Sequence, residues 1–226
     1  MLTRPQVFDP QGMSRNLFSG DLIATMESVP ATNANTAVTL TGALLALGMY
    51  LSSGGAAVTL TLDTAANIVA SLAPQFGFNQ NAALPGGTPN YAAIPNGTSF
   101  RFRIIISTAF AVTVAATANT GVTINRGSVA ASSSRDFLVT FNNGTPAQTY
   151  AVNSTNASAT LSGLSQAQLA TLSVGMVVTN AALGLQGATI QSINFNAGTV
   201  TMSGNANATA IGTALTFSPV ITVDGL

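Results

Sequence analysis

The chain of 226 residues contains no cysteine, no histidine and no lysine. Without cysteine it can form neither a disulfide framework nor a thiolate metal site. General acid–base catalysis would depend on six carboxylates, and their spacing places no two of them on one face. We therefore expect no enzyme, no cofactor and no metal site. Calcium held by backbone and Asn carbonyl oxygens is the alternative, although no Asp-rich calcium loop occurs.

Charge is scarce. Charged residues make up 5% of the chain, with a formal net charge of zero, whereas ordinary soluble domains carry about 25%. A neutral surface is weakly hydrated and promotes association, so we expect much of it to be buried against other subunits. A tightly folded neutral monomer is the alternative. The absence of a basic patch argues against a nucleic-acid partner.

Long hydrophobic runs are also missing. The longest, residues 37–51, is interrupted by Thr39, Gly42 and Gly48, and it is shorter than the ~20 residues that a spanning helix needs. This run predicts a protein core, and we expect no membrane partner. Residues 1–6 lack the apolar stretch of a secretory signal, so we expect synthesis and assembly in a cytoplasm.

Residues 1–36 differ from the rest of the chain because charges alternate there with pairs of apolar residues. Prolines and glycines interrupt the segment too often for a long helix. We predict an extended N-terminal arm whose apolar side chains dock on a neighbouring subunit. The candidate anchors are Phe8, Phe18, Leu22 and Ile23. A disordered leader is the alternative.

Residues 37–152 are predicted to form a mainly β domain with two short helices. Residues 41–48 begin with threonine and end with glycine, which is typical of a short capped helix. Residues 57–62 alternate apolar residues with threonine, as a half-buried strand does. A second helix should follow, capped by Asp63 and ended by Pro74.

The strongest strand pattern spans residues 99–106, where Phe and Ile residues share one face and Arg101 and Arg103 share the other. Similar alternation recurs in three later segments, residues 110–114, 137–141 and 149–152. Together they predict a β-sandwich or barrel. Arg101 and Arg103 are candidate contacts with acidic residues of a neighbouring subunit, and a solvated sheet face is the alternative.

Residues 153–226 carry a single charge, Asp224, and consist of short apolar alternations separated by turns such as residues 196–198. Their spacing predicts a separate, small antiparallel β-sandwich of Ig-like form with about five or more short strands. The predicted organisation is therefore an arm (1–36), a β-sandwich or barrel domain (37–152) and a small surface module (153–226).

The order of several short motifs in residues 37–152 resembles a small domain of head decoration and head-fibre proteins of tailed bacteriophages. That domain has a helix opening with Thr, a TLPTA helix start, a GxSFxF strand, a GVTL strand and a final SxxFxVxFTN strand. The corresponding segments here are residues 41–45, 60–69, 96–102, 121–124 and 133–137. The chain departs from the pattern in the turn-rich segment of residues 76–96 and in Asp63, where proline is common.

Residues 155–217 resemble a second module, which recurs in phage fibre and virion surface proteins. Its sequence motifs LxVGMxV, GxTIxSI and VTLSxxAT correspond to residues 172–178, 187–193 and 200–206. This resemblance implies an exposed surface module with no chemistry attached.

The two resemblances imply a structural virion protein on the capsid exterior. We expect a decoration, or cement, protein that binds the major capsid protein as a homotrimer and stabilises contacts between capsid subunits. The alternative is a head-fibre or tail-fibre component whose C-terminal module binds a host surface glycan. A cell-wall hydrolase is a further alternative, which the missing histidines and scattered carboxylates disfavour.

Overall fold

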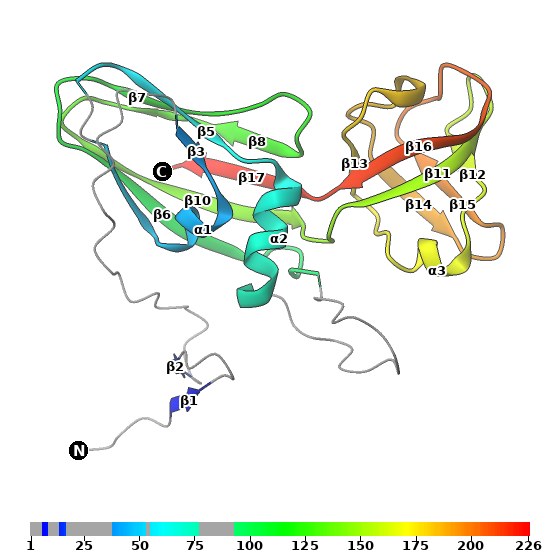
Figure 1. Ribbon diagram of the computed structural model, residues 1–226, viewed down its shortest axis with the longest axis horizontal. Coiled ribbons are helices and arrows are strands. Elements are labelled where there is room, and N and C mark those ends of the chain that lie inside the picture. Colours follow the sequence, from blue (N-terminus) through cyan, green and yellow to red (C-terminus); the bar gives the residue numbers. More distant parts are fainter. Residues whose placement is uncertain (1–5, 9–13, 17–37, 53–54, 77–92) are drawn as a thin grey trace.

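The computed structural model describes residues 6–8, 14–16, 38–52, 55–76 and 93–226. Most of these residues form two β-rich lobes that lie side by side (Figure 1). A separate two-stranded sheet pairs β1 (Gln6–Phe8) with β2 (Ser14–Asn16) in antiparallel fashion. The predicted mainly β class with few short helices is confirmed.

The first lobe consists of two sheets. The five-stranded sheet contains, in spatial order, β4 (Met49–Ser52), β6 (Ser99–Ile106), β10 (Ser134–Asn143), β17 (Val220–Gly225) and β8 (Val122–Asn125). The four-stranded sheet contains β3 (Val38–Leu40), β5 (Val58–Leu62), β7 (Val112–Ala116) and β9 (Ser128–Val129). Residues from both sheets share one hydrophobic core, so this lobe is a sandwich, as the alternation predicts.

The alternation along β6 and β10 explains why these strands form the centre of the core. Phe102 and Ile104 in β6 are buried, whereas Arg101 and Arg103 between them are exposed. The ring of Phe102 stacks on that of Phe137 in β10, with centroids 5.1 Å apart. A period of two thus assigns every second side chain to the core.

Two helices pack against each other in this lobe. The helix α1 (Gly42–Ala46) begins after Thr41, whose hydroxyl accepts a hydrogen bond from the backbone N–H of Leu44 at 3.4 Å. A Cβ at Gly42 would lie 3.0 Å from the carbonyl oxygen of Ile68 in α2 (Ala65–Phe76). Glycine at this position therefore lets the two helices approach closely.

The second helix differs from its prediction at both ends. Thr64 is its cap, since the Thr64 hydroxyl accepts from the Asn67 N–H at 3.2 Å. Asp63 lies one residue earlier and supports the cap by accepting from the Thr64 N–H and the Asn67 side chain, both at 2.8 Å. The helix also continues past Pro74 to Phe76. Proline has a helical φ and removes only one backbone donor, which this last turn tolerates.

The second lobe is a single six-stranded sheet in which all neighbouring strands are antiparallel. Its strands, in spatial order, are β13 (Val177–Val178), β16 (Ala210–Ser218), β11 (Gln148–Ser154), β12 (Thr160–Ser162), β15 (Thr199–Met202) and β14 (Ile190–Asn194). It also contains the helix α3 (Gln166–Leu169), capped reciprocally by Ser165 and Gln168, and the 3₁₀ helix η1 (Ala182–Gly184).

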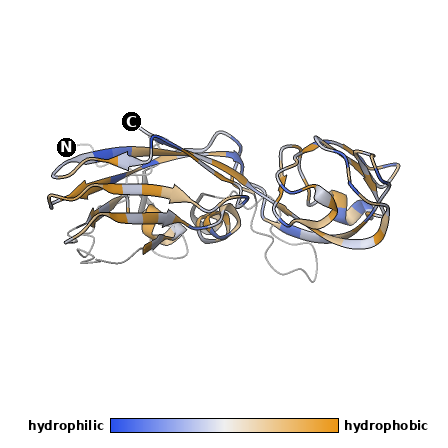
Figure 2. Cartoon of the chain, turned by 90° about the horizontal axis from the view of Figure 1, so that it is seen from above, coloured by the Kyte–Doolittle hydropathy of each residue, from blue (hydrophilic) through white to orange (hydrophobic). Residues whose placement is uncertain are grey.

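This sheet closes on itself. Val177 in β13 forms a bridge with Thr189, next to β14. The Val178 N–H donates to the Ala188 carbonyl at 2.8 Å, and the Ile190 N–H donates to the Met176 carbonyl at 2.9 Å. The lobe is thus a small barrel with its own core, in place of the two facing sheets of an Ig-like sandwich (Figure 2). Closure pairs strand edges that would otherwise be exposed.

The second lobe is an insertion into the first. The chain leaves the first lobe at the end of β10, builds the barrel from residues 148–218, and returns through Pro219 into β17. There β17 pairs with β10 on one side and with β8 on the other. The predicted division at residue 153 differs from this arrangement at both ends, because β11 already belongs to the barrel and residues 220–225 belong to the first lobe.

This topology predicts opposite outcomes for two shortened chains. Ending the chain at residue 152 removes Ile221 and Val223, which are fully buried in the first core and contribute about 1.5–3 kcal/mol each. Replacing residues 144–219 with Asn-Gly joins Asn143 to Val220, which already pair, by a two-residue hairpin turn. We expect the first chain to be unfolded and the second to melt cooperatively, as measured by circular dichroism. An equally stable 1–152 fragment would contradict the topology.

Candidate functional site

Charged groups are unevenly distributed between the lobes. Residues 137–223 contain no charged side chain, so the barrel is entirely neutral. Within the described residues no group of three His, Cys, Asp or Glu residues could hold a metal ion. In the same part of the chain, no helix is long and apolar enough to cross a membrane. The charged surface of the described chain lies on the first lobe.

The outer face of the five-stranded sheet carries the ion pair between Arg103 and Asp136. These residues lie directly opposite each other on β6 and β10. The guanidinium of Arg103 donates two hydrogen bonds to the carboxylate, from Nε to Oδ1 at 2.6 Å and from Nη2 to Oδ2 at 2.8 Å. Arg103, expected to meet an acid of a neighbouring subunit, is thus paired within its own chain.

The pair shifts the titration of Asp136. Hydrogen bonding from Arg103 lowers the pKa of Asp136 below its ordinary value of 3.8, partial burial opposes this, and the positive charges of Arg103 and Arg101 lower the pKa further. The same hydrogen bond raises the pKa of Arg103. Both side chains remain partly exposed, so solvent screens the interaction and its contribution to stability is modest.

Arg101 is the other predicted contact residue on β6, and its surroundings differ. It is exposed and makes no hydrogen bond or ion pair with the described residues. It lies opposite Leu138 on β10, and Leu138 lies opposite Asp224 on β17. The Asp224 carboxylate accepts a hydrogen bond from the Asn125 side chain at 2.7 Å. A row with arginine, leucine and aspartate thus crosses the sheet.

Arg135 stabilises a turn of the first lobe, a role that its position in the sequence does not reveal. Its guanidinium donates to the carbonyl oxygens of Arg126 at 3.0 Å and of Ser128 at 2.5 Å. Arg126 has a positive φ of 54°, so this turn is in the left-handed region. The two hydrogen bonds hold the turn where the chain passes from β8 in one sheet to β9 in the other.

The predicted anchors of the N-terminal arm are not brought together with this face. The backbone of Phe8 ends β1, and its partner in β2 is Ser14. Phe18, Leu22 and Ile23 lie outside the described residues. Their part in binding stays a prediction.

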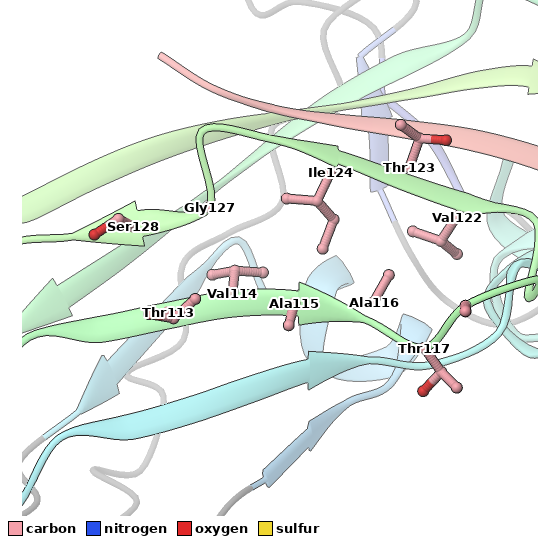
Figure 3. A pocket seen from close by; sticks show the side chains of 11 residues that line it. Thr113, Val114, Ala115, Ala116, Thr117, Val122, Thr123, Ile124, Gly127 and Ser128 are labelled. Atoms are coloured by element: carbon pink, nitrogen blue, oxygen red, sulfur yellow. The ribbon is translucent and has the colours of Figure 1, made fainter.

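A shallow groove of about 440 Å³ lies where the two sheets of the first lobe separate (Figure 3). It runs between β7 and β8, and Val114, Ala116, Val122 and Ile124 contribute to its lining. Small aliphatic and hydroxyl side chains line it throughout, and none of them can act as an acid, base or nucleophile activated by one.

A buried polar cluster joins the two lobes. The side chain of Asn143, at the end of β10, is 1% exposed. Its Nδ2 donates to the Ser173 hydroxyl at 2.8 Å and to the Val174 carbonyl at 3.0 Å, both in the barrel. Its Oδ1 accepts from the Thr145 N–H at 2.9 Å. Asn143 thus fixes the barrel to the sandwich through one side chain with satisfied donors and acceptors.

Sequence reasoning missed this cluster, although one signal was present. Asn143-Gly144 interrupts an apolar alternation and precedes Thr145-Pro146, a combination typical of a turn at a module boundary. In the structure Gly144 forms a bridge with Ile94, and a Cβ at Gly144 would lie 2.2 Å from the Ile94 carbonyl oxygen. The junction thus requires Asn143 for its buried hydrogen bonds and Gly144 because a Cβ there would collide with the Ile94 carbonyl group.

Substitution of Asn143 with Ala should destabilise the protein by about 1–3 kcal/mol, because the buried partners on Ser173 and Val174 lose their donor. Asn142→Ala is the matched control, since the Asn142 side chain is exposed and, among the described residues, bonds only the Thr222 hydroxyl. Chemical denaturation followed by circular dichroism would give both values. Equal, small changes for the two variants would contradict the role assigned to Asn143.

Asp136→Asn should lower stability at neutral pH, and the difference from the unchanged chain should disappear in acid. A carboxylate with a lowered pKa stabilises the fold above its unfolded pKa and loses that contribution as pH falls through the folded value, here below 3.8. Melting temperatures measured between pH 7 and pH 2 would test this. A difference that stays constant with pH would show that the charge of Asp136 has no part.

The features of the described surface are thus the Arg103–Asp136 ion pair, the row of Arg101, Leu138 and Asp224, and the groove between β7 and β8. No family model, curated protein or solved structure matches the chain. Function is therefore inferred from the residues, their pairing and their exposure.

Proposed function

We propose that this chain is a structural protein of a bacteriophage virion that binds the outer capsid surface and stabilises contacts between major capsid subunits. The observation that carries the proposal is the charge-free stretch of residues 137–223, which includes the whole barrel. A module without ionic groups can be buried against protein without the cost of desolvating charges. The motif order of residues 37–152, described above, supports the same class.

The mechanism is added buried area, repeated over a lattice of identical sites. The neutral surface is rich in Asn, Ser and Thr, whose side chains both donate and accept hydrogen bonds across a subunit contact. A single contact of this kind is weak, but several contacts made by one linked molecule reinforce each other. We propose that the chain acts as a homotrimer, with Phe8, Phe18, Leu22 and Ile23 of the arm as anchors on the major capsid protein.

The junction between the lobes supports a role in bridging. Two short segments of chain connect the lobes, residues 144–147 and Pro219, and Asn143 adds buried hydrogen bonds beside them. A molecule that bridges two capsid subunits resists their separation only if its own two halves stay together. Two short connections with a buried side-chain contact meet that need better than a single flexible linker.

A head-fibre or tail-fibre component that binds the host surface is the second candidate. The observation in its favour is that the barrel is a separate module with large exposed apolar side chains, Ile211 at 88% and Phe195 at 47% exposure. An exposed aromatic ring between Asn194 and Asn196 could stack on a sugar of a surface glycan.

Antiserum raised against the purified chain should label the capsids of the encoding phage in electron micrographs. Adding the protein to capsids that lack it should restore the label, whereas a chain without residues 1–36 should bind at least about tenfold more weakly if the arm supplies the anchors. Label on fibres alone would favour the second candidate. Virions without any label would overturn both.

A further inference from the structure

The row that crosses the five-stranded sheet has an unusual charge order. Arg101, Leu138 and Asp224 are direct cross-strand neighbours on β6, β10 and β17. All three point away from the core, because their chain neighbours Phe102, Phe137 and Val223 are buried. The two charges lie two strand spacings apart, about 10 Å between backbones, and form no ion pair with each other in the described part of the chain.

This order is complementary to itself. Consider two copies whose outer sheet faces lie against each other. A two-fold axis in the plane between them, parallel to β10 and passing at Leu138, reverses the order of the row from one copy to the other. It leaves each residue at the same height along the strands. Arg101 of one copy then faces Asp224 of the other, Asp224 faces Arg101, and Leu138 faces Leu138. An axis perpendicular to the strands would instead place Arg101 on Arg101. Only the first arrangement joins opposite charges, and it forms both pairs at once.

From this complementarity we propose that the outer face of the five-stranded sheet binds the same face of a second copy of the chain about a two-fold axis. Arg101 and Asp224 form the two reciprocal ion pairs, and the Leu138 side chains pack between them. The neighbouring row on one side, Thr140 and Thr222, adds neutral polar groups that hydrogen-bond without a sign preference.

The row on the other side is compatible with this contact. It contains Arg103 and Asp136, each already neutralised by the other through two hydrogen bonds. Near the two-fold axis the Asp136 carboxylates of the two copies approach each other. The positive charge of Arg103 on the same chain neutralises each of them. Arg101 and Asp224 are thus the two charges of this face that form no ion pair with the described residues, although Asp224 accepts a hydrogen bond from Asn125.

The size of the face limits the area that the contact can bury. Five strands spaced about 4.8 Å apart, over three or four outward rows, give an interface on the order of 1,000 Å² for both copies. This area is at the low end of specific interfaces. We therefore expect a contact that forms at micromolar concentration and weakens with salt, because its pairs lie near the solvent.

The contact does not rest on the proposed function. It is a property of the isolated chain, and virion labelling neither requires it nor tests it. It can also coexist with the predicted trimer, in which case it would join two trimers.

Charge reversal gives the test. Sedimentation equilibrium of the full chain at about 10–100 micromolar should give an average mass that Arg101→Glu lowers toward half, and Asp224→Arg should do the same. Each single reversal places like charges together twice and should raise the dissociation constant at least about tenfold. The double variant Arg101→Glu with Asp224→Arg inverts the row and should restore the original mass.

Thr59→Glu is the control, because Thr59 is exposed on β5 in the other sheet and should leave the mass unchanged. Circular dichroism of each variant would establish that it folds. A wild-type mass equal to one chain, or a mass that Arg101→Glu does not change, would overturn the proposal. Failure of the double variant to regain the mass lost in folded single variants would overturn the pairing of Arg101 with Asp224.

Discussion

The pairing of β17 between β10 and β8 is the constraint on which both lobes depend. It brings the last residues of the chain into the middle of the first sheet, where Ile221 and Val223 complete the core. The same pairing obliges the barrel to begin and end at adjacent strands, since β10 leads out and β17 leads back. The first core and the position of the barrel are thus fixed by one set of backbone hydrogen bonds, and Asn143 secures that passage from the side.

The alternation of apolar and polar residues along the chain predicted where strands lie, but it did not predict which strands pair with each other. Alternation in β6 and β10 identified the buried faces, because a period of two is a property of each strand alone. The segment of β17 also alternates, with Ile221 and Val223 buried, but nothing in its short sequence indicates that its partners are β10 and β8 rather than strands of the barrel. Asp224 and Asn125 are 99 residues apart and nevertheless bond. Likewise, the sequence placed Arg103 on an outward face, but only the register sets it opposite Asp136.

The hydrogen bonds at the junction between the lobes are made by uncharged groups, as the neutral sequence of the barrel requires. A lobe without charged groups must satisfy its buried polar atoms with amides and hydroxyls, and at the junction it does so: Thr179 bonds the buried Ser218, and Ser173 bonds both Asn143 and Thr145. Such bonds are individually modest but leave no ion to desolvate. The chain can therefore be rigid inside and remain compatible with burial outside.

The scarcity of charge also gives each remaining charge more weight. A neutral surface of hydroxyl and amide groups accepts many relative orientations of a partner with similar energies, because such groups both donate and accept. A few fixed charges remove most of these orientations, since like charges that meet cost more than unlike charges gain. On the outer face of the five-stranded sheet, Arg103 and Asp136 cancel locally, and Arg101 and Asp224 remain as a directed pair about Leu138. In a chain so nearly uncharged, this pair is what can set one orientation between neutral faces.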